Sequence, residues 1–381
     1  MKKKILAVAV AGAFAVPAFA HADSSVTLSG TLQTQVVGYG SWGDADSNVE
    51  MADAGGIVAR GDGAGPNRIT FDVNHDLGGG LSAIARYNTD LNVSSAGGLS
   101  DRDTYVGLSG DFGTVTVGRQ ATPFNTAGRD PLNATFLQAR MNAGRTGPLG
   151  GLGNGGFLDD AIAYSNDWGM VNFAGALVLD PADDSDTALS ARVGFNVMDG
   201  LEIYGAYTHA DDHSFVANQL DGNAGEFVDL IRGWADIIGV SGALDDLDGD
   251  GTSIEDALLV GAGDARLGKI GADWSQGPFR VVGEVEHVDI ETAAGNTVAD
   301  YEAYFLSGSY TMGQLDFVLN LGHTDNTGGS NGRDYVGFAT KYNFSNNVMA
   351  YAGVGYLDDR GFNDGEGEDT TSVGAGMRVS F

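Results

Sequence analysis

Hydrophobic and polar residues alternate with a period of two along most of the chain. In the first such segment, Val26, Leu28 and Leu32 share one face, while Gln33 and Gln35 share the other. This alternation is typical of a β-strand with one apolar and one polar face. It recurs in sixteen segments, at 26–35, 67–75, 81–91, 101–109, 114–119, 160–165, 170–179, 187–197, 201–210, 264–274, 279–291, 301–311, 315–324, 333–344, 348–358 and 372–381.

The connections between these segments alternate in length. Short ones such as Met198-Asp199-Gly200 are rich in residues that tolerate the positive φ of tight hairpins. Long, polar connections occupy 41–66, 121–159, 211–263 and 359–369. An even number of antiparallel strands with short turns on one side and long loops on the other indicates an outer-membrane barrel. A secreted β-sandwich also alternates, but sixteen strands exceed what an open sheet usually carries, and closure removes exposed edges.

We therefore predict an all-β fold, a transmembrane antiparallel β-barrel of about sixteen strands. It forms one domain over residues 23–381, with an acidic extracellular insertion at 211–263. Residues 1–22 are interpreted as a signal peptide, because Lys2, Lys3 and Lys4 precede an apolar run that ends at a small-residue cleavage site, Ala20-His21-Ala22. The run is shorter than the roughly 20 residues of a spanning helix.

Composition narrows the possible functions. The 381 residues contain 60 Gly, no Cys, and 20 basic against 51 acidic residues, for a net charge of −31. A nucleic-acid partner is disfavoured because binding phosphates requires a basic face. Disulfides and thiolate metal sites are excluded. Excess Gly fits closely packed strands, and aromatic residues near strand ends are candidates for interfacial girdles, namely Tyr39, Tyr87, Trp168, Tyr204, Trp274, Tyr342 and Tyr356.

An enzymatic barrel is the weaker alternative. Nucleophilic or acid–base chemistry needs Ser, His and carboxylates in convergent positions. The mature chain instead scatters its histidines over different strands and one loop, at His75, His209, His213, His287 and His323. We expect no catalytic residues and no required cofactor.

Two stretches carry a family resemblance. Residues 67–124 include NRITFDVNHDLGGGLSAIARYNTDL and DRDTYVGLSGDFGTVTVGRQATPF, and the ends read VTLSGTLQTQ and MRVSF. They resemble the general diffusion porins of Gram-negative bacteria, whose hairpins carry a similar DLG-G-L-A turn and a YVGL-G-FGTVT-GRQ-P unit leading into the third loop. The resemblance holds residue by residue over 101–124 and at the C-terminus. Over the remaining mature chain it extends only to the arrangement of strands and loops.

The resemblance implies a passive, water-filled channel for small hydrophilic solutes and ions, built as a homotrimer in the Gram-negative outer membrane after export through the periplasm. It implies a third loop folded into the lumen. Phe381 is similar to the terminal aromatic by which the barrel-assembly machinery recognises its clients. Outer-membrane lipid and lipopolysaccharide are the other partners implied.

Pore-lining candidates come from the polar strand faces. Alternation places Arg68, Arg86, Arg192, Arg280 and Arg378 on those faces. In similar porins, such arginines face an acidic third loop. This chain departs from that pattern, because residues 121–159 contain only Asp130 and, at the end, Asp159, beside Arg129, Arg140 and Arg145. Arg119 shares parity with apolar Val115 and Val117, so we expect it beyond the apolar band or after a bulge.

Ion preference is open to two opposed arguments. Loss of three signal-peptide lysines takes the charge from −31 to −34, which raises the cation concentration at the mouth and favours cations. The arginine wall argues the other way, because charge at the constriction dominates selectivity. We predict cation preference on the net charge.

The insertion at 211–263 contains a calcium-like motif. Asp246, Asp248 and Asp250 alternate around Gly249, much as in an EF-hand loop, and Glu255 and Asp256 lie just short of the twelfth position, which is Ala257. We predict weak Ca²⁺ binding at 245–256, with a merely solvated acidic loop as the alternative. Divalent cations could also bridge such loops on neighbouring trimers. An outer-membrane barrel with a structural or adhesive role through this acidic calcium-binding loop is the alternative to a channel.

Overall fold

The computed structural model describes residues 24–40, 48–56, 60–61, 66–94, 101–179, 187–211, 262–292, 297–326, 332–360 and 369–381. The predicted signal peptide, most of the acidic insertion and its five candidate metal ligands lie outside these residues. Among the helices described, none is long and apolar enough to cross a membrane.

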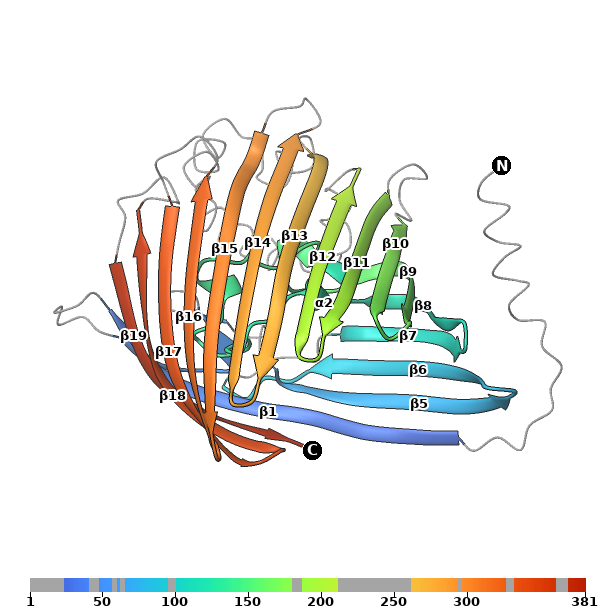
Figure 1. Cartoon of the computed structure of the whole chain (residues 1–381), viewed down its shortest axis with the longest axis horizontal. Coiled ribbons are helices and arrows are strands. Elements are labelled where there is room, and N and C mark those ends of the chain that lie inside the picture. Colours follow the sequence, from blue (N-terminus) through green and yellow to red (C-terminus); the bar gives the residue numbers. More distant parts are fainter. Residues whose placement is uncertain are drawn as a thin grey trace.

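Sixteen long antiparallel strands form the wall (Figure 1), and each predicted segment is confirmed as one of them. They are β1 (Ser24–Gly40), β5 (Arg68–Gly78), β6 (Leu81–Asp90), β7 (Asp101–Gly110), β8 (Gly113–Gln120), β9 (Leu158–Asp167), β10 (Val171–Leu179), β11 (Thr187–Met198), β12 (Leu201–Ala210), β13 (Ala262–Gln276), β14 (Phe279–Thr292), β15 (Thr297–Met312), β16 (Leu315–Asn326), β17 (Gly332–Ser345), β18 (Val348–Asp359) and β19 (Asp369–Ser380). Three short strands lie in the first loop, namely β2 (Asn48–Ala52), β3 (Ala54–Gly55) and β4 (Arg60–Gly61).

The first and last long strands pair and close the sheet. Residues Thr31–Gly40 of β1 pair with β19, while Ser24–Thr31 pair with β5. The last closing bonds join Gly30 and Phe381, whose backbone groups exchange N–H···O bonds of 2.9 and 3.0 Å. Closure gives the backbone groups at both sheet edges a partner, which hydrocarbon surroundings demand.

Side chains separate by parity. On β1, Val26, Leu28 and Val36 point outward and are 47–68% exposed, while Gln33 and Gln35 point inward and are 1% exposed. The apolar face is therefore the outer surface of the barrel and the polar face lines its lumen, as in barrels that span a membrane. One girdle candidate is wrong: Tyr204 is 1% exposed and points inward, where its hydroxyl donates to Glu284 at 2.7 Å.

The connections at the two ends of the barrel differ in length, as the sequence predicted. Two-residue turns link β5 to β6, β11 to β12, β13 to β14 and β15 to β16. Gly79, Gly200, Gly277 and Gly313 in these turns have φ between 58° and 79°, which glycine adopts without strain. The long connections share the opposite end, so the third one, residues 121–157, is free to fold back into the barrel.

Closure depends on a glycine. A Cβ on Gly30 would lie 2.5 Å from Cζ of Phe381 and 2.8 Å from the carbonyl oxygen of Arg68. We expect Gly30→Val to lower the yield of folded barrel, measured as the fraction that keeps compact mobility on an unheated SDS gel. Gly268→Val is the control, because a Cβ there has no atom within 4 Å. Equal yields would contradict this role of Gly30.

Candidate functional site

The third loop, residues 121–157, connects β8 to β9 and lies inside the barrel (Figure 1). It contains α2 (Pro123–Ala127) and two 3-10 turns, η1 (Ala139–Met141) and η2 (Leu149–Gly151). The Thr122 hydroxyl accepts a hydrogen bond from the backbone N–H of Asn125 at 3.3 Å and caps α2, and Pro123 starts the helix.

Apolar side chains seat the loop against the wall. Phe124, Phe136 and Leu137 are 0–1% exposed although they belong to a loop in a polar lumen. Phe124 packs in a cluster that includes Tyr204 of β12, and Leu137 packs in one that includes Tyr335 of β17. Burial of each such side chain contributes about 1.5–3 kcal/mol, so the loop is a fixed part of the lumen.

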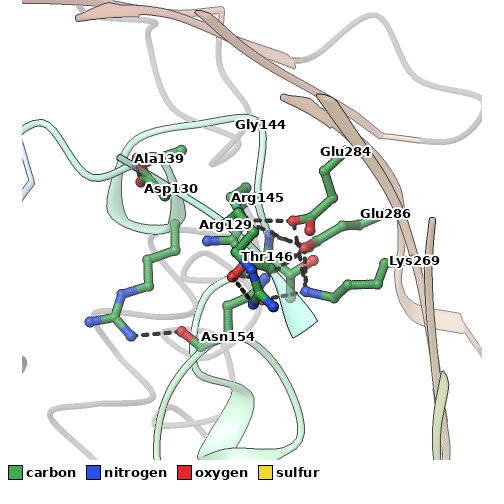
Figure 2. A network of polar contacts seen from close by, with 12 residues as sticks. Arg129, Asp130, Ala139, Gly144, Arg145, Thr146, Asn154, Lys269, Glu284 and Glu286 are labelled. Carbon is green, nitrogen blue, oxygen red and sulfur yellow. Dashed lines mark hydrogen bonds and ion pairs between the residues drawn. The ribbon is translucent and has the colours of Figure 1, made fainter. Parts of the chain in front are cut away.

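A buried charge network joins the loop to β13 and β14 (Figure 2). Arg145 Nε lies 2.6 Å from Glu284, and Lys269 Nζ lies 2.8 Å from Glu286. The four side chains are 0–5% exposed, and the two cations balance the two carboxylates. Burial alone would lower the pKa of Arg145, but Glu284 and Glu286 outweigh it and raise that pKa above its ordinary value.

Neutral donors complete this network. The carboxylate of Glu286 accepts from the backbone N–H of Thr146 at 2.6 Å and from Asn154 Nδ2 at 2.8 and 3.0 Å. Figure 2 shows these loop groups and the wall side chains pointing at one another. Buried ions are tolerated only when their remaining hydrogen-bonding capacity is met in this way.

Asp130 holds the loop together and ties it to β16 of the wall. Its Oδ1 accepts from the backbone N–H of Leu132 and from Asn320 Nδ2, both at 2.8 Å, and its Oδ2 accepts from the backbone N–H of Ala139 at 2.8 Å. The predicted constriction carboxylate is thus held by three donors.

Between the loop and the opposite wall, a cavity of about 650 Å³ remains. Its charged lining consists of five arginines and three aspartates, namely Arg68, Arg102, Arg119, Arg140, Arg378, Asp90, Asp101 and Asp130. Four of the seven pore-lining candidates therefore converge here: Arg68, Arg119, Arg378 and Asp130.

Arg119 lines the cavity although it shares parity with apolar Val115 and Val117. Gly118, directly before it, has φ of 136°, and the register of β8 against β9 shifts between Gly118 and Gln120, with the extra residue on β9. The pairing of Arg119 with Thr104 of β7 is regular. Arg119 Nη1 lies 2.8 Å from Asp159, next to this irregularity.

Two arginines that line the cavity were not predicted as pore residues from the sequence. Arg102 lies where the register of β6 against β7 shifts between Tyr87 and Thr89, so simple alternation does not place it. Arg140 lies in the loop, where no period operates. Its Nη1 donates to the Asn154 carbonyl at 2.8 Å. Burial, reinforced by Arg145, lowers the pKa of Arg140 to about 10, so it stays charged at neutral pH.

The other three candidates line different parts of the wall and are paired. Arg86 forms a two-bond ion pair with Asp72 at 2.7 and 3.1 Å. Arg280 forms another with Asp273 at 2.9 and 2.7 Å, and both line a polar recess of about 450 Å³ together with Glu202.

Arg192 lies 2.5 Å from Glu202. Within the described residues, no group of three or more His, Cys, Asp and Glu side chains could hold a metal ion. Asp246, Asp248, Asp250, Glu255 and Asp256 fall outside that set.

Comparisons with known proteins agree with this architecture. A family profile described as Gram-negative porin matches residues 7–361. The major outer membrane protein P.IB of Neisseria gonorrhoeae is 27% identical over 198 residues, 51% of this chain and 53% of that protein. P.IB of Neisseria meningitidis serogroup A is 37% identical over 123 residues, 31% and 34% of the respective chains. The chain thus spans about half the length, or less, of these relatives.

Solved structures share the fold. An anion-selective porin from Comamonas acidovorans matches with a TM-score of 0.68 and 19% identity, over 94% of this chain and 100% of that one. A trimer form of OmpT from Vibrio cholerae matches with a TM-score of 0.63 and 13% identity, over 94% and 99% of the respective chains.

The charge network yields a prediction about the loop. Arg145→Met leaves two buried carboxylates opposite Lys269 alone, so we expect a loss of about 3–5 kcal/mol in stability. The folded band should melt at a lower temperature in detergent, and open-channel current noise should rise. Arg129→Met is the matched control, because Arg129 lies 3.4 Å from Glu202 and is 31% exposed, where ion pairs contribute about 0–1 kcal/mol. Equal melting of both variants would contradict an anchoring role.

Proposed function

This chain belongs to the Gram-negative porin family, and we propose that its barrel is a passive, water-filled channel for small hydrophilic solutes whose narrow region favours anions. The family match, the outer membrane protein relatives and the barrel establish it as an outer-membrane protein.

The observation that carries the proposal is the arginine excess around the 650 Å³ cavity. Selectivity follows the charge at the narrowest point of a pore. Much of the acidic excess of the chain comes from residues 211–264, which alone contain 13 carboxylates. At physiological ionic strength, charges further away than about 8 Å are largely screened. The cavity arginines therefore weigh more than the net charge, and we propose anion preference in place of the cation preference expected from composition.

Two further points support this proposal. A protein of the same fold is described as an anion-selective porin, although the 19% identity speaks for the fold alone. Against an enzymatic role, the four histidines in the described part of the chain lie on four separate strands, with His75 on β5, His209 on β12, His287 on β14 and His323 on β16.

The assembly is proposed as a homotrimer, supported by the trimer form of the OmpT neighbour. Mass measurement of the purified, unheated protein in detergent tests it. Contacts with lipopolysaccharide, and recognition of Phe381 by the assembly machinery, stay predictions.

Selectivity is measurable in a planar bilayer. Under a KCl gradient, wild-type channels should show a reversal potential of the sign for anions, and the preference should fall as salt rises, because screening shortens to about 3 Å at 1 M. The double variant Arg68→Gln with Arg378→Gln should lose most of the preference. Arg280→Gln, outside the cavity, should retain it. A cation-type potential for the wild type would refute the anion proposal.

Calcium binding by the acidic insertion is a separate proposal. Its carboxylates repel one another without a cation, and the missing twelfth ligand should leave a dissociation constant of roughly 10⁻⁴–10⁻³ M. Millimolar Ca²⁺ should protect residues 211–263 from protease, and Asp248→Ala with Asp250→Ala should abolish the protection. An identical response of wild type and double variant would identify a merely solvated loop.

A further inference from the structure

The cavity contains a more specific arrangement than an excess of positive charge. We propose that Arg68, Arg378, Thr31 and Ser380 form a binding site for a doubly charged tetrahedral oxyanion, such as hydrogen phosphate. The inference rests on the proposed channel function, because the site lines the same cavity.

Three neighbouring strands bring the four side chains together. Thr31 of β1 lies opposite Arg68 of β5 on one side and opposite Ser380 of β19 on the other. Arg378 lies opposite Gln33, two residues along β1 and on the same inward face. All four line the cavity, so their donors face one space.

The two arginines have no carboxylate in direct contact. Among the described residues, neither Arg68 nor Arg378 lies within ion-pair distance of a carboxylate, although Asp90, opposite Arg68 on β6, and Asp103 act on Arg68 from further away. Arg378 Nε donates to Gln33 Oε1 at 2.7 Å, and its Nη2 reaches the carbonyl oxygens of Asn133 and Ala134 only at 3.4 and 3.3 Å. Gln33 therefore fixes the guanidinium and leaves its Nη1 side available to a ligand.

The nearby carboxylates contact groups other than these two arginines. Asp90 lies 2.6 Å from Arg102, and Asp130 is held by three donors. Asp101 accepts from the Tyr87 hydroxyl at 3.2 Å, and Asp103 accepts from the backbone N–H of Ala121 at 3.0 Å. Arg119 is paired with Asp159. Arg68 and Arg378 thus present two guanidinium groups without direct carboxylate contact to one space, and two such cations suit a dianion.

The hydroxyls of Thr31 and Ser380 add directional hydrogen-bond donors to the two charged side chains. Thr31 Oγ1 and Ser380 Oγ are 3.2 Å apart, so one donates to the other and the accepting hydroxyl keeps its own O–H for a ligand. Guanidinium groups bind phosphate-like oxygens through charge-assisted bonds. A tetrahedral oxyanion has several acceptors to satisfy these donors, whereas chloride has no such directionality. Conduction requires such a site to bind weakly enough to release its ligand.

The test measures chloride current through planar bilayers at constant ionic strength while inorganic phosphate is added at about pH 8, where it is mainly a dianion. We expect phosphate to reduce the current along a saturating curve. Perchlorate, a tetrahedral monoanion, should block much less. Either Arg68→Gln or Arg378→Gln should raise the half-blocking concentration about tenfold, and Arg280→Gln should leave it unchanged.

A second variant separates this site from general anion attraction. Thr31→Val with Ser380→Ala removes both hydroxyls but no charge, so it should weaken the phosphate block without changing the reversal potential in KCl. A phosphate effect without saturation, equal block by perchlorate, or an unchanged hydroxyl variant would overturn the site. In each of these cases the wild type would still conduct chloride before phosphate is added. Failure of the proposed function would instead appear as no chloride current in the wild type.

Discussion

The structure depends on the requirement that every backbone N–H and C=O find a partner where water is absent. In hydrocarbon, a sheet meets this requirement only by closing on itself. Pairing of β1 with β19 and the last bonds between Gly30 and Phe381 complete that closure. Closure also sets the chemistry of the interior, because a strand with a period of two must present every second side chain to the lumen.

A lumen lined by polar side chains then needs a partner for each buried group. The third loop supplies many of them. Its apolar residues cover parts of β11–β18, and its Arg145 meets Glu284 on β14. In this buried contact the charges run opposite to the distribution that the resemblance implied, because the loop contributes the cation Arg145 and the wall contributes Glu284 and Glu286. Docked in this way, the loop leaves the lumen open toward β5–β7 and β19, where the arginines gather.

The strands could be predicted from sequence because their signal is local. The period of two predicts which face of the sheet Val26, Leu28 and Gln33 occupy, and the glycine-containing turns predict the hairpins. Prediction failed where that period breaks or does not operate. A register shift displaced Arg102, Tyr204 was assigned outward as an aromatic residue near a strand end, and Arg140 lies in a loop. The contact of Arg145 with Glu284 joins residues 139 positions apart, which no single-sequence pattern reports. The acidic insertion lies outside the described residues, so its calcium motif stays a prediction.

Net charge and local charge give opposite expectations for permeation, and distance decides between them. A charge that is separated from an ion by water and salt is screened over about a nanometre. An arginine in the cavity acts at contact, with less water in between. What matters at contact is also how much of each charge is already compensated. Arg86, Arg192 and Arg280 face the lumen, yet each has a carboxylate within 2.7 Å. Arg68 and Arg378 have none at that distance among the described residues, and both line the cavity, so their charge is the part of the lining most directly open to a solute there.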